Sequence, residues 1–567
     1  MTKKRWKVLP PDPGAQSALC ARLGIRPLTA QLLINRGLAE PDRASSFLKP
    51  DINHLHDPFL LKDMDRAVER IVSAIAKREK IAVYGDYDVD GTTSAAMLHL
   101  FFRELGVDAA CHIPDRLTEG YGLNAGAIDR LCGEGVRLVI TVDCGSSNRD
   151  EVRHASSLGV DVIVTDHHEL PEDAPAAFAL LNPRQKGCAF PFKGLAGVGV
   201  AFNLMMALRS RLRRLGWFRG TEPNLRRYLD LVSVGTIADM VPLVDENRIL
   251  VAHGLKEIER GGRPGLKALA EAAGLRPGRV SSGAVAFQLA PRINAAGRLA
   301  RASAAFNLLV SGDAGEARRL AEALNRENAS RQRIESGILE EALSMMEGKT
   351  PDRGVVLFSE KWHPGVIGIV ASRLVERLSR PVVMIAVDGG SGRGSARGIK
   401  SFDILEGLRS CSALLERYGG HRGAAGLTVA RENIERFRDA FIDHLNAALT
   451  DEDLVPEVVC DAEVPLDGID RPFMMEMEGL APFGSSNREP LLCVRDAAIT
   501  GASIAGGKHL RFTVAQNGCA RGAIGFNLAG LHPIGGKRFR IAFSPFLDEW
   551  QGNAGLRLRI KEVEAGA

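Results

Sequence analysis

Three aspartates at alternating positions carry the clearest chemical signal in the sequence. They lie in the run Gly85-Asp86-Tyr87-Asp88-Val89-Asp90-Gly91. Carboxylates this close together repel one another unless a cation neutralises them, and Mg²⁺ and Mn²⁺ favour oxygen ligands. The alternative interpretation is an aspartate-rich turn that caps a following helix. The spacing alone leaves both interpretations open.

Further polar residues downstream extend this signal, each after an apolar run. They are Asp143, Asp166, His167, His168 and Asp239. Open α/β sheets bind ligands at the carboxyl ends of their strands, so we expect these residues at one rim. An imidazole among carboxylates is typical of a manganese site. A surface loop is the alternative for the histidine pair, and a buried helix cap is the alternative for Asp239.

The candidate metal ligands are sufficient for two divalent ions that share a carboxylate. They are Asp88, Asp90, Asp143, His167 and Asp239. Two such ions about 3.5–4 Å apart activate a water molecule and stabilise an in-line phosphoryl displacement. The residues therefore predict a two-metal phosphoesterase.

The apolar runs that carry these residues alternate with helical patterns. Residues 81–84, 137–142 and 160–164 are short and apolar, whereas residues 92–105 have one apolar helical face. Strands that alternate with helices predict a parallel α/β sheet.

Three further regions follow along the chain. Residues 313–347 have one apolar face and few glycines, and as a continuous helix they would extend about 50 Å. A second α/β unit begins near residue 355, and short alternating runs after about residue 455 predict a small all-β domain. We expect an N-terminal segment (1–75), a catalytic domain (76–310), a connecting helix (311–350), a second α/β domain (351–452) and a β domain (455–567).

The composition is that of a globular protein. The chain has 567 residues, 45% apolar and 25% charged, with a formal net charge of +4, which argues against a disordered or fibrous chain. We expect no membrane span, because no window approaches 18 uninterrupted apolar residues, and no signal peptide. Nine cysteines occur singly, without a Cys-x-x-Cys pair, which favours a reducing, cytoplasmic location.

Several segments could hold a nucleic acid. We expect a glycine-rich loop at residues 390–398, which offers flexible backbone donors and two arginines to a phosphate; the alternative is a mobile hairpin loop without that role. Residues 209–227 carry seven arginines against one glutamate, for which a solvated face is the favoured interpretation. Trp362 is either a stacking edge or a core residue. In the β domain the candidate contacts are Lys508, Arg511 and Arg557.

The ordered motifs resemble a known superfamily. GDYDVDG, VDCG, TDHH and VGTIADMVPL are similar to the successive motifs of the DHH phosphoesterases, and RYGGHRGAAG is similar to the GGH signature of their DHHA1 partner domain. GYGLN, LNPR, GVGVAF, PRINAAGR, WHPGVIGIVASRL and PFGSSNREP resemble the bacterial single-stranded-DNA-specific exonucleases of that superfamily. Arg488 departs from the family pattern, which has proline there. The implied fold is two α/β domains, DHH and DHHA1, joined by a long helix around a groove, plus an OB-like β domain.

The resemblance implies a role for each matching residue. It makes the five candidate ligands the holders of two Mn²⁺ or Mg²⁺ ions, Asp86 a supporting carboxylate, and Asp166 the residue that orients the histidine pair. His168 and His421 would contact the substrate phosphate, which the amides of Gly419 and Gly420 would approach closely. Four residues would form a pocket for a 5′-phosphate: Arg116, Arg298, Ser395 and Arg397.

The function implied by the resemblance is 5′-to-3′ hydrolysis of single-stranded DNA to mononucleotides, in recombination and repair. Single-strand-binding protein and a helicase are the partners that the family implies. One alternative is a phosphodiesterase for oligonucleotides or cyclic dinucleotides. Another is a catalytically inactive scaffold that binds single strands, although all five candidate ligands are present.

Overall fold

The computed structural model describes residues 4–116, 118–275, 278, 280–299, 303–348, 352–548 and 555–566. The chain forms two compact units, which are described separately. The large unit comprises residues 8–325 and 459–567, and the small unit comprises residues 1–7 and 326–458. The domain limits expected from the sequence remain predictions. Among the described helices, none combines the length and apolar character that crossing a membrane requires.

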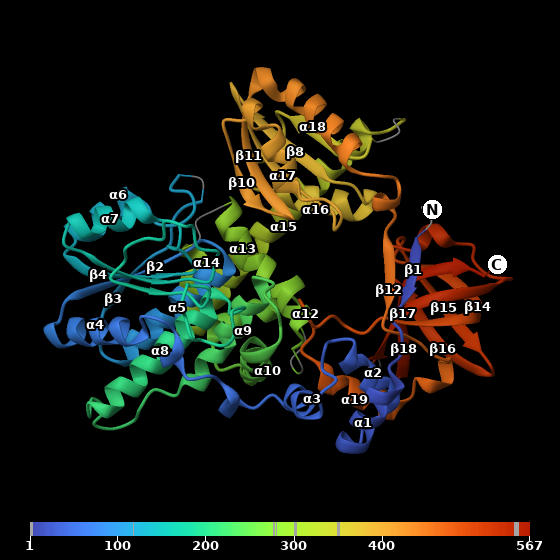
Figure 1. Ribbon diagram of the computed structural model, residues 1–567, viewed down its shortest axis with the longest axis horizontal. Coiled ribbons are helices and arrows are strands. Elements are labelled where there is room, and N and C mark those ends of the chain that lie inside the picture. The colour runs from blue at the N-terminus through green and yellow to red at the C-terminus, as the bar shows by residue number, and fades with distance from the viewer. Residues whose placement is uncertain are drawn as a thin grey trace. The chain divides into compact units, whose positions relative to one another are not determined.

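A five-stranded parallel sheet lies among the helices of residues 64–310 in the large unit (Figure 1). Its order is β3-β2-β4-β5-β6. The strands are β2 (Lys80–Gly85), β3 (Ala109–His112), β4 (Val136–Val142), β5 (Asp161–Thr165) and β6 (Ala179–Leu181). The parallel sheet expected from the apolar runs is confirmed, and the two short edge strands β3 and β6 are additions to that expectation.

Helices cover both faces of this sheet. Successive strand residues point to opposite sides, so each face has its own apolar surface to bury. Ile81 and Val83 enter one core, whereas Ala82 and Tyr84 enter the other. The helices before α10 are α4 (Met64–Lys77), α5 (Val89–Glu104), α6 (Ala125–Gly133), α7 (Arg149–Ser157), α8 (Gly197–Arg214) and α9 (Leu229–Ala238). They are followed by α10 (Asp245–Arg260), α11 (Pro264–Ala272), α12 (Ser282–Ala284), the π-helical turn η4 (Val285–Leu289), α13 (Ala290–Leu299) and α14 (Ser303–Val310).

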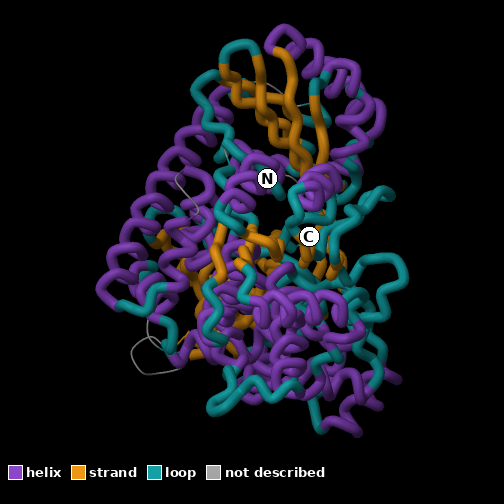
Figure 2. Tube along the Cα trace, turned by 90° about the vertical axis from the view of Figure 1, so that its left-hand side faces the viewer, coloured by secondary structure: helices purple, strands orange, loops and turns teal. Residues whose placement is uncertain are grey.

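The long helix expected at residues 313–347 is present as α15 (Ala314–Met345). The small unit then continues with a five-stranded sheet flanked by helices (Figure 2). The sheet order is β10-β11-β9-β8-β7. The strands are β7 (Val355–Ser359), β8 (Val382–Asp388), β9 (Ser391–Arg397), β10 (Arg417–His421) and β11 (Ala424–Ala430). The helices are α16 (Ile367–Leu378), α17 (Ile404–Ser410) and α18 (Ile434–Ala448).

The glycine-rich segment 390–398 is not a loop, which corrects the expectation from its composition. It forms β9, which is paired on both sides with β8 and β11. A Cβ atom at Gly392 would lie 2.7 Å from Ile385 Cγ2, and one at Gly394 would lie 2.6 Å from Leu427 Cγ. These glycines therefore serve close packing within the sheet rather than flexibility.

The C-terminal strands close into a barrel-like sheet in the order β13-β14-β15-β16-β18-β17, with an added pairing of β14 and β17. The strands are β13 (Ala462–Glu463), β14 (Leu492–Ala505), β15 (His509–Gln516), β16 (Cys519–Gly525), β17 (Arg538–Asp548) and β18 (Gly555–Ala565). The expected all-β domain is confirmed. A separate two-stranded sheet pairs β1 (Arg5–Val8) with β12 (Glu457–Cys460).

The N-terminal helices share one core with this barrel, which the sequence pattern did not indicate. These helices are α1 (Pro13–Leu23), α2 (Pro27–Ile34) and α3 (Pro41–Leu48), and α19 (Arg471–Leu480) joins them. Arg248 links α10 to the same region. Its buried guanidinium donates hydrogen bonds of 2.8–3.0 Å to carbonyl groups of α3 and of the C-terminal end of α19, namely those of Phe47, Gly479, Leu480 and Ala481.

Two other expectations concern the surface. Three arginines of residues 209–227 form ion pairs with acids. Arg209 and Arg213 both pair with Glu222, and Arg211 pairs with Glu69. That arrangement agrees with a solvated face. Trp362 is 4% exposed, so it is a core residue rather than a stacking edge. All nine cysteines are free.

Candidate metal centre

The three alternating aspartates follow β2 and turn into α5. Asp88 caps the helix, because its Oδ1 accepts the Gly91 amide at 3.0 Å. Gly91 has to be glycine here, since a Cβ atom would lie 2.5 Å from the Asp86 nitrogen. Asp86 and Asp90 are almost fully buried. The capping interpretation is therefore correct for Asp88, and it leaves the carboxylate cluster intact.

Asp90 is fixed by the start of another helix. Its two carboxylate oxygens accept the Gly197 and Val198 amides of α8 at 2.7 and 2.8 Å. The free amides and the dipole of a helix N-terminus stabilise such a negative charge. These amides lie more than a hundred residues away in the sequence, so helix α8 positions the carboxylate from across the fold.

Asp143 follows β4 with a left-handed backbone, at φ 61°. Its amide donates to the Thr165 carbonyl at 2.9 Å, which continues the β4–β5 pairing by one residue. A Cβ atom at position 197 would lie 2.6 Å from Asp143 Oδ1, so Gly197 allows both carboxylates to approach α8. An unfavourable φ in a non-glycine residue concentrates at functional sites.

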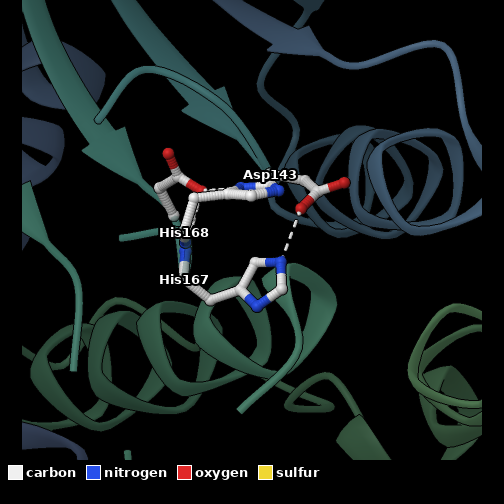
Figure 3. Close-up of side chains that lie close together, drawn as sticks. Asp143, His167 and His168 are labelled. Atoms are coloured by element: carbon white, nitrogen blue, oxygen red, sulfur yellow. Dashed lines mark hydrogen bonds and ion pairs between the residues drawn. The ribbon is translucent and has the colours of Figure 1, made fainter. Parts of the chain in front are cut away.

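The histidine pair follows β5 and is divided between two environments (Figure 3). His167 points toward Asp143, with its Nε2 3.2 Å from Asp143 Oδ1. His168 Nδ1 lies 2.8 Å from Asp166 Oδ1 instead. Asp166 also accepts the backbone amides of Ser146 and His167, at 2.8 and 2.7 Å. Asp166 therefore contacts both histidines, His167 through its backbone amide and His168 through its ring and its amide.

Asp239 directly follows α9, and its amide donates to the Gly235 carbonyl at 2.9 Å. Its Oδ2 lies 3.5 Å from His167 Nε2. Gly235 is needed for close packing, because a Cβ atom there would lie 2.8 Å from Asp90 Oδ1. The end of α9 therefore brings a carboxylate from a fourth segment of the chain to the same rim.

These side chains form three groups whose ligand atoms lie within 4.8 Å of one another. The groups are Asp86, Asp88 and Asp143; Asp90, His167 and Asp239; and Asp143, Asp166, His167 and His168. Asp143 lies between the first two groups, because it belongs to one and contacts His167 of the other. Asp86 thus lies among the candidate ligands, which is a closer placement than the supporting role expected for it.

The electrostatics of the cluster favour occupation by cations. Buried atoms without a hydrogen-bond partner include Asp86 Oδ1, Asp143 Oδ1 and His167 Nε2. Burial and then neighbouring carboxylates raise the pKa of Asp86, Asp90 and Asp143, and raise the pKa of Asp239 to about 7. Unpaired buried carboxylates are costly, and divalent cations remove that cost. The donor set fits two divalent ions of the Mg²⁺ or Mn²⁺ type.

The two histidines differ in basicity. Burial and then the charge of His168 lower the pKa of His167 to about 4, which suits a neutral metal-binding imidazole. Burial would lower the pKa of His168 as well, but its hydrogen bond to Asp166 and the charge of that carboxylate raise it to about 9. The same pairing outweighs burial at Asp166 and lowers the pKa of that carboxyl.

The remaining residues expected at the site are spread over both units. In the large unit, the Arg116 guanidinium lies 5.0 Å from the centre of the Tyr87 ring. Tyr87 lies between Asp86 and Asp88 in the sequence. Arg298 belongs to α13, but its side chain lies outside the described residues.

In the small unit, Ser395 and Arg397 share one face of β9. A Cβ atom at Gly368, in the first turn of α16, would lie 2.9 Å from Arg397 Nη2 and 3.2 Å from Ser395 Oγ. The two side chains therefore lie over the start of a helix, where the positive end of the helix dipole favours anions.

The GGH residues form the exposed edge strand β10 of the same sheet. Gly420 has φ 145°, and a Cβ atom there would lie 2.5 Å from the Ala424 carbonyl, so the hairpin itself requires this glycine. Gly419 has open space beside it. His421 Nδ1 accepts the Gly423 amide at 3.2 Å.

Sequence reasoning missed several supporting residues. The Tyr121 hydroxyl lies 3.2 Å from His168 Nδ1, and Asn182 donates to the Ser146 hydroxyl and the His168 carbonyl. With the two amides of α8, these residues hold the cluster in place. Their motifs, GYGLN, LNPR and GVGVAF, were visible in the sequence, but their contacts depend on the tertiary fold.

Comparisons with known proteins agree with this geometry. Family models match residues 80–236 (DHH family, N-terminal domain), 352–447 (DHHA1 domain) and 460–562 (RecJ OB domain). The single-stranded-DNA-specific exonuclease RecJ of Bacillus subtilis is 38% identical, over 99% of this chain and 71% of the relative. Crystal structures of Thermus thermophilus RecJ match at 32% identity: the Mn²⁺ complex has a TM-score of 0.85, over 99% of this chain and 80% of that one, and the Mg²⁺ complex 0.80, over 99% and 79%.

The fold and the buried Asp/His cluster define a DHH-type phosphoesterase with a DHHA1 domain. The RecJ OB domain model and the sequence identity to the RecJ relatives identify one family within the DHH phosphoesterases. The chain belongs to the RecJ family.

Proposed function

We propose that the protein is a metal-dependent exonuclease that degrades single-stranded DNA from its 5′ end to mononucleotides. The observation that carries the proposal is the Asp/His cluster, in which Asp143 lies between two groups of ligand atoms. The RecJ relatives bear the name of this activity, and the Thermus structures contain Mn²⁺ or Mg²⁺. The expected ligands are Asp88, Asp90, Asp143, His167 and Asp239, and Asp86 joins them.

Two divalent cations bound there would supply an activated water molecule and offset the charge that develops on the phosphate. The chain's own residues hold and orient the reacting groups. Asp166 accepts the Nδ1 hydrogen of His168, so the Nε2 hydrogen of His168 is available to the scissile phosphate or to the leaving oxygen. Tyr121 contacts the same imidazole and limits its rotation.

A terminal phosphate would be held by Arg116, Arg298, Ser395 and Arg397. In support, Ser395 and Arg397 lie over the first turn of α16, where a guanidinium and a hydroxyl meet the positive end of a helix dipole. His421 and the neighbouring Gly419 and Gly420 would contact a substrate phosphate from β10, which is exposed along its length. The site residues and the 5′ polarity are parts of the proposal.

We extend the proposal to the setting of the protein. We expect the barrel to bind single-stranded DNA as well, through base stacking and contacts from basic side chains. Single-strand-binding protein and a helicase are proposed as partners in recombination and repair, and a cytoplasmic location suits nine free cysteines.

The test uses oligonucleotides that carry a label at the 5′ or the 3′ end. Mononucleotides should be released first from the 5′ end of a long single strand, in Mn²⁺ or Mg²⁺ and not in EDTA. A blunt duplex should resist, and a dinucleotide should be cleaved far more slowly than the long strand. Faster cleavage of the dinucleotide, or release from the 3′ end, would contradict the proposal.

A further inference from the structure

Phe287 is the most exposed large apolar side chain in the described part of the protein, at 81%. It lies in the middle of the π-helical turn η4, and its neighbours Val285 and Leu289 are fully buried. A single exposed apolar residue is ordinary on a protein surface. An aromatic ring exposed on a π-helical turn is less ordinary, because such turns are frequent at functional sites.

The surroundings of this turn connect it to the metal centre. Turn η4 packs against α9, the helix that ends at the candidate ligand Asp239. Met240, which follows that ligand, is 76% exposed and has a left-handed backbone, at φ 61°. Two strongly exposed apolar side chains are therefore connected to α9: Met240 directly follows the ligand at its end, and Phe287 lies on a turn that packs against the helix.

A cation lies on the helical turn after the aromatic ring. The Arg292 guanidinium donates to the Gln288 carbonyl at 2.5 Å and to Asn325 Oδ1 at 3.0 Å. No carboxylate partner of Arg292 is found among the ion pairs of the described residues. No acid therefore neutralises the charge of Arg292. An exposed aromatic ring next to such a cation is the combination that single-stranded nucleic acids bind.

Helix α13, which continues directly from η4, gives the distance from Phe287 to the aspartate turn at residues 86–90. A Cβ atom at Gly297 would lie 2.7 Å from the Tyr87 carbonyl, so the far end of α13 lies against the aspartate turn and near Arg116. Ten residues separate that contact from Phe287, or about 15 Å along a helix. This length corresponds to about four stacked nucleotides at roughly 3.4 Å each, and to fewer in an extended strand.

We propose that Phe287, with Arg292 on the following helical turn, is a stacking platform for one base of the DNA strand, about two to five nucleotides from its 5′ end. This inference rests on the proposed function, because the 5′ end has to lie at the aspartate turn. The platform holds the strand in line with the metal centre and takes no part in bond cleavage. Its action is therefore on substrate binding, with little effect on the chemical step.

The test scans a 5′-phosphorylated 20-nucleotide strand with a single abasic (tetrahydrofuran) residue at positions two to seven. For the wild type, cleavage at subsaturating DNA should fall by about 5- to 150-fold at one of the positions two to five, since base stacking on an aromatic side chain has that effect. Phe287→Ala should lower cleavage of the intact strand by a similar factor. It should show no further loss at the same position, and Phe287→Trp should restore the wild-type profile.

Single-turnover rates at saturating DNA should agree within about threefold for all variants. Met475→Ala, which truncates a residue 68% exposed on α19, is the matched control and should behave as the wild type. The same scan read by fluorescence anisotropy in EDTA reports the platform without hydrolysis, so a failure of the proposed function is distinguishable. Identical abasic profiles for the wild type and Phe287→Ala would overturn the inference, as would a change of oligomeric state as the only effect of the substitution.

Discussion

The sheets of the two units carry opposite kinds of polar residue. At the rim of β2–β6, several carboxylates are buried together with oxygen and nitrogen atoms that lack hydrogen-bond partners. In the sheet of β7–β11, the polar residues of interest are cationic or neutral, and β10 is exposed along its length. The first arrangement is electrostatically unfavourable until cations arrive, whereas the second is stable without any ligand.

This difference indicates that the two sheets have different tasks: one carries the chemical step and the other recognises phosphate. The buried acids suit the chemical step, because cations held there act in a water-poor environment. The exposed strand β10 and the arginines of the neighbouring sheet strand β9 suit the recognition of phosphate, which is itself an anion. Substitutions in the first sheet should therefore change the rate of the chemical step, and substitutions in the second should change which DNA ends are accepted.

The largest effect is expected for Asp143→Ala, because Asp143 lies between both groups of ligand atoms. Single-turnover hydrolysis should fall by at least about 1,000-fold, which corresponds to about 4 kcal/mol. Binding of single-stranded DNA should change by less than about threefold, as measured by fluorescence anisotropy. Asp150→Ala, which removes an exposed acid on α7, should leave both quantities unchanged.

A thermal measurement separates a metal role of Asp143 from a structural one. Mn²⁺ should raise the melting temperature of the wild type, because a ligand that binds only the folded state stabilises it. The rise should be smaller in Asp143→Ala. In EDTA the variant should melt within a few degrees of the wild type, because the loss of one buried acid offsets the cost of alanine at a φ of 61°. A much less stable variant in EDTA, with the Mn²⁺ response intact, would assign Asp143 to the fold.

An intermediate effect is expected in the second sheet. Arg397→Ala should lower kcat/KM for 5′-phosphorylated strands by about 10- to 150-fold, because a hydrogen bond to a charged group contributes about 1.5–3 kcal/mol. Strands with a 5′-hydroxyl should lose much less. Arg393→Ala, four residues earlier on β9, is the matched control and should affect both substrates equally. An equal loss on both substrates in Arg397→Ala would place the pocket for the terminal phosphate elsewhere.

Much of the metal centre was predictable from the sequence because its signals are local. Short apolar runs that end in aspartate or histidine identify strands, and the rule for open α/β sheets brings their carboxyl ends together. That reasoning placed Asp143 and His167 at one rim, where the structure has them 3.2 Å apart. The amides that hold Asp90 come from a helix more than a hundred residues later, and no local pattern announces such a contact.

Two other features were hidden for different physical reasons. Glycines usually indicate turns, so β9 was expected to be a loop, although its glycines serve close packing against Ile385 and Leu427. The shared core of the N-terminal helices and the barrel depends on the partners of buried side chains, and Arg248 illustrates this. Its four carbonyl partners lie in two segments about 430 residues apart in sequence.

The smallest effect on the chemical step is expected in the C-terminal barrel. Removal of the whole barrel would expose its shared core and take away carbonyl partners of Arg248, so surface substitutions give a cleaner test. Lys508, Arg511 and Arg557 are exposed, and the triple alanine variant should weaken binding of single-stranded DNA. Three lost phosphate contacts should also reduce the slope of log K against log salt by about 2, at roughly 0.7 per contact.

The single-turnover rate at saturating DNA should stay within about twofold of the wild type, because none of these residues belongs to the carboxylate cluster. The matched control is Arg213→Ala, which removes an exposed arginine that pairs with Glu222 at the end of α8. It should leave the salt slope unchanged. A rate that falls in the triple variant even at saturating DNA would show that the barrel positions the strand for cleavage. Recognition and chemistry would then be coupled through the DNA rather than divided between separate surfaces.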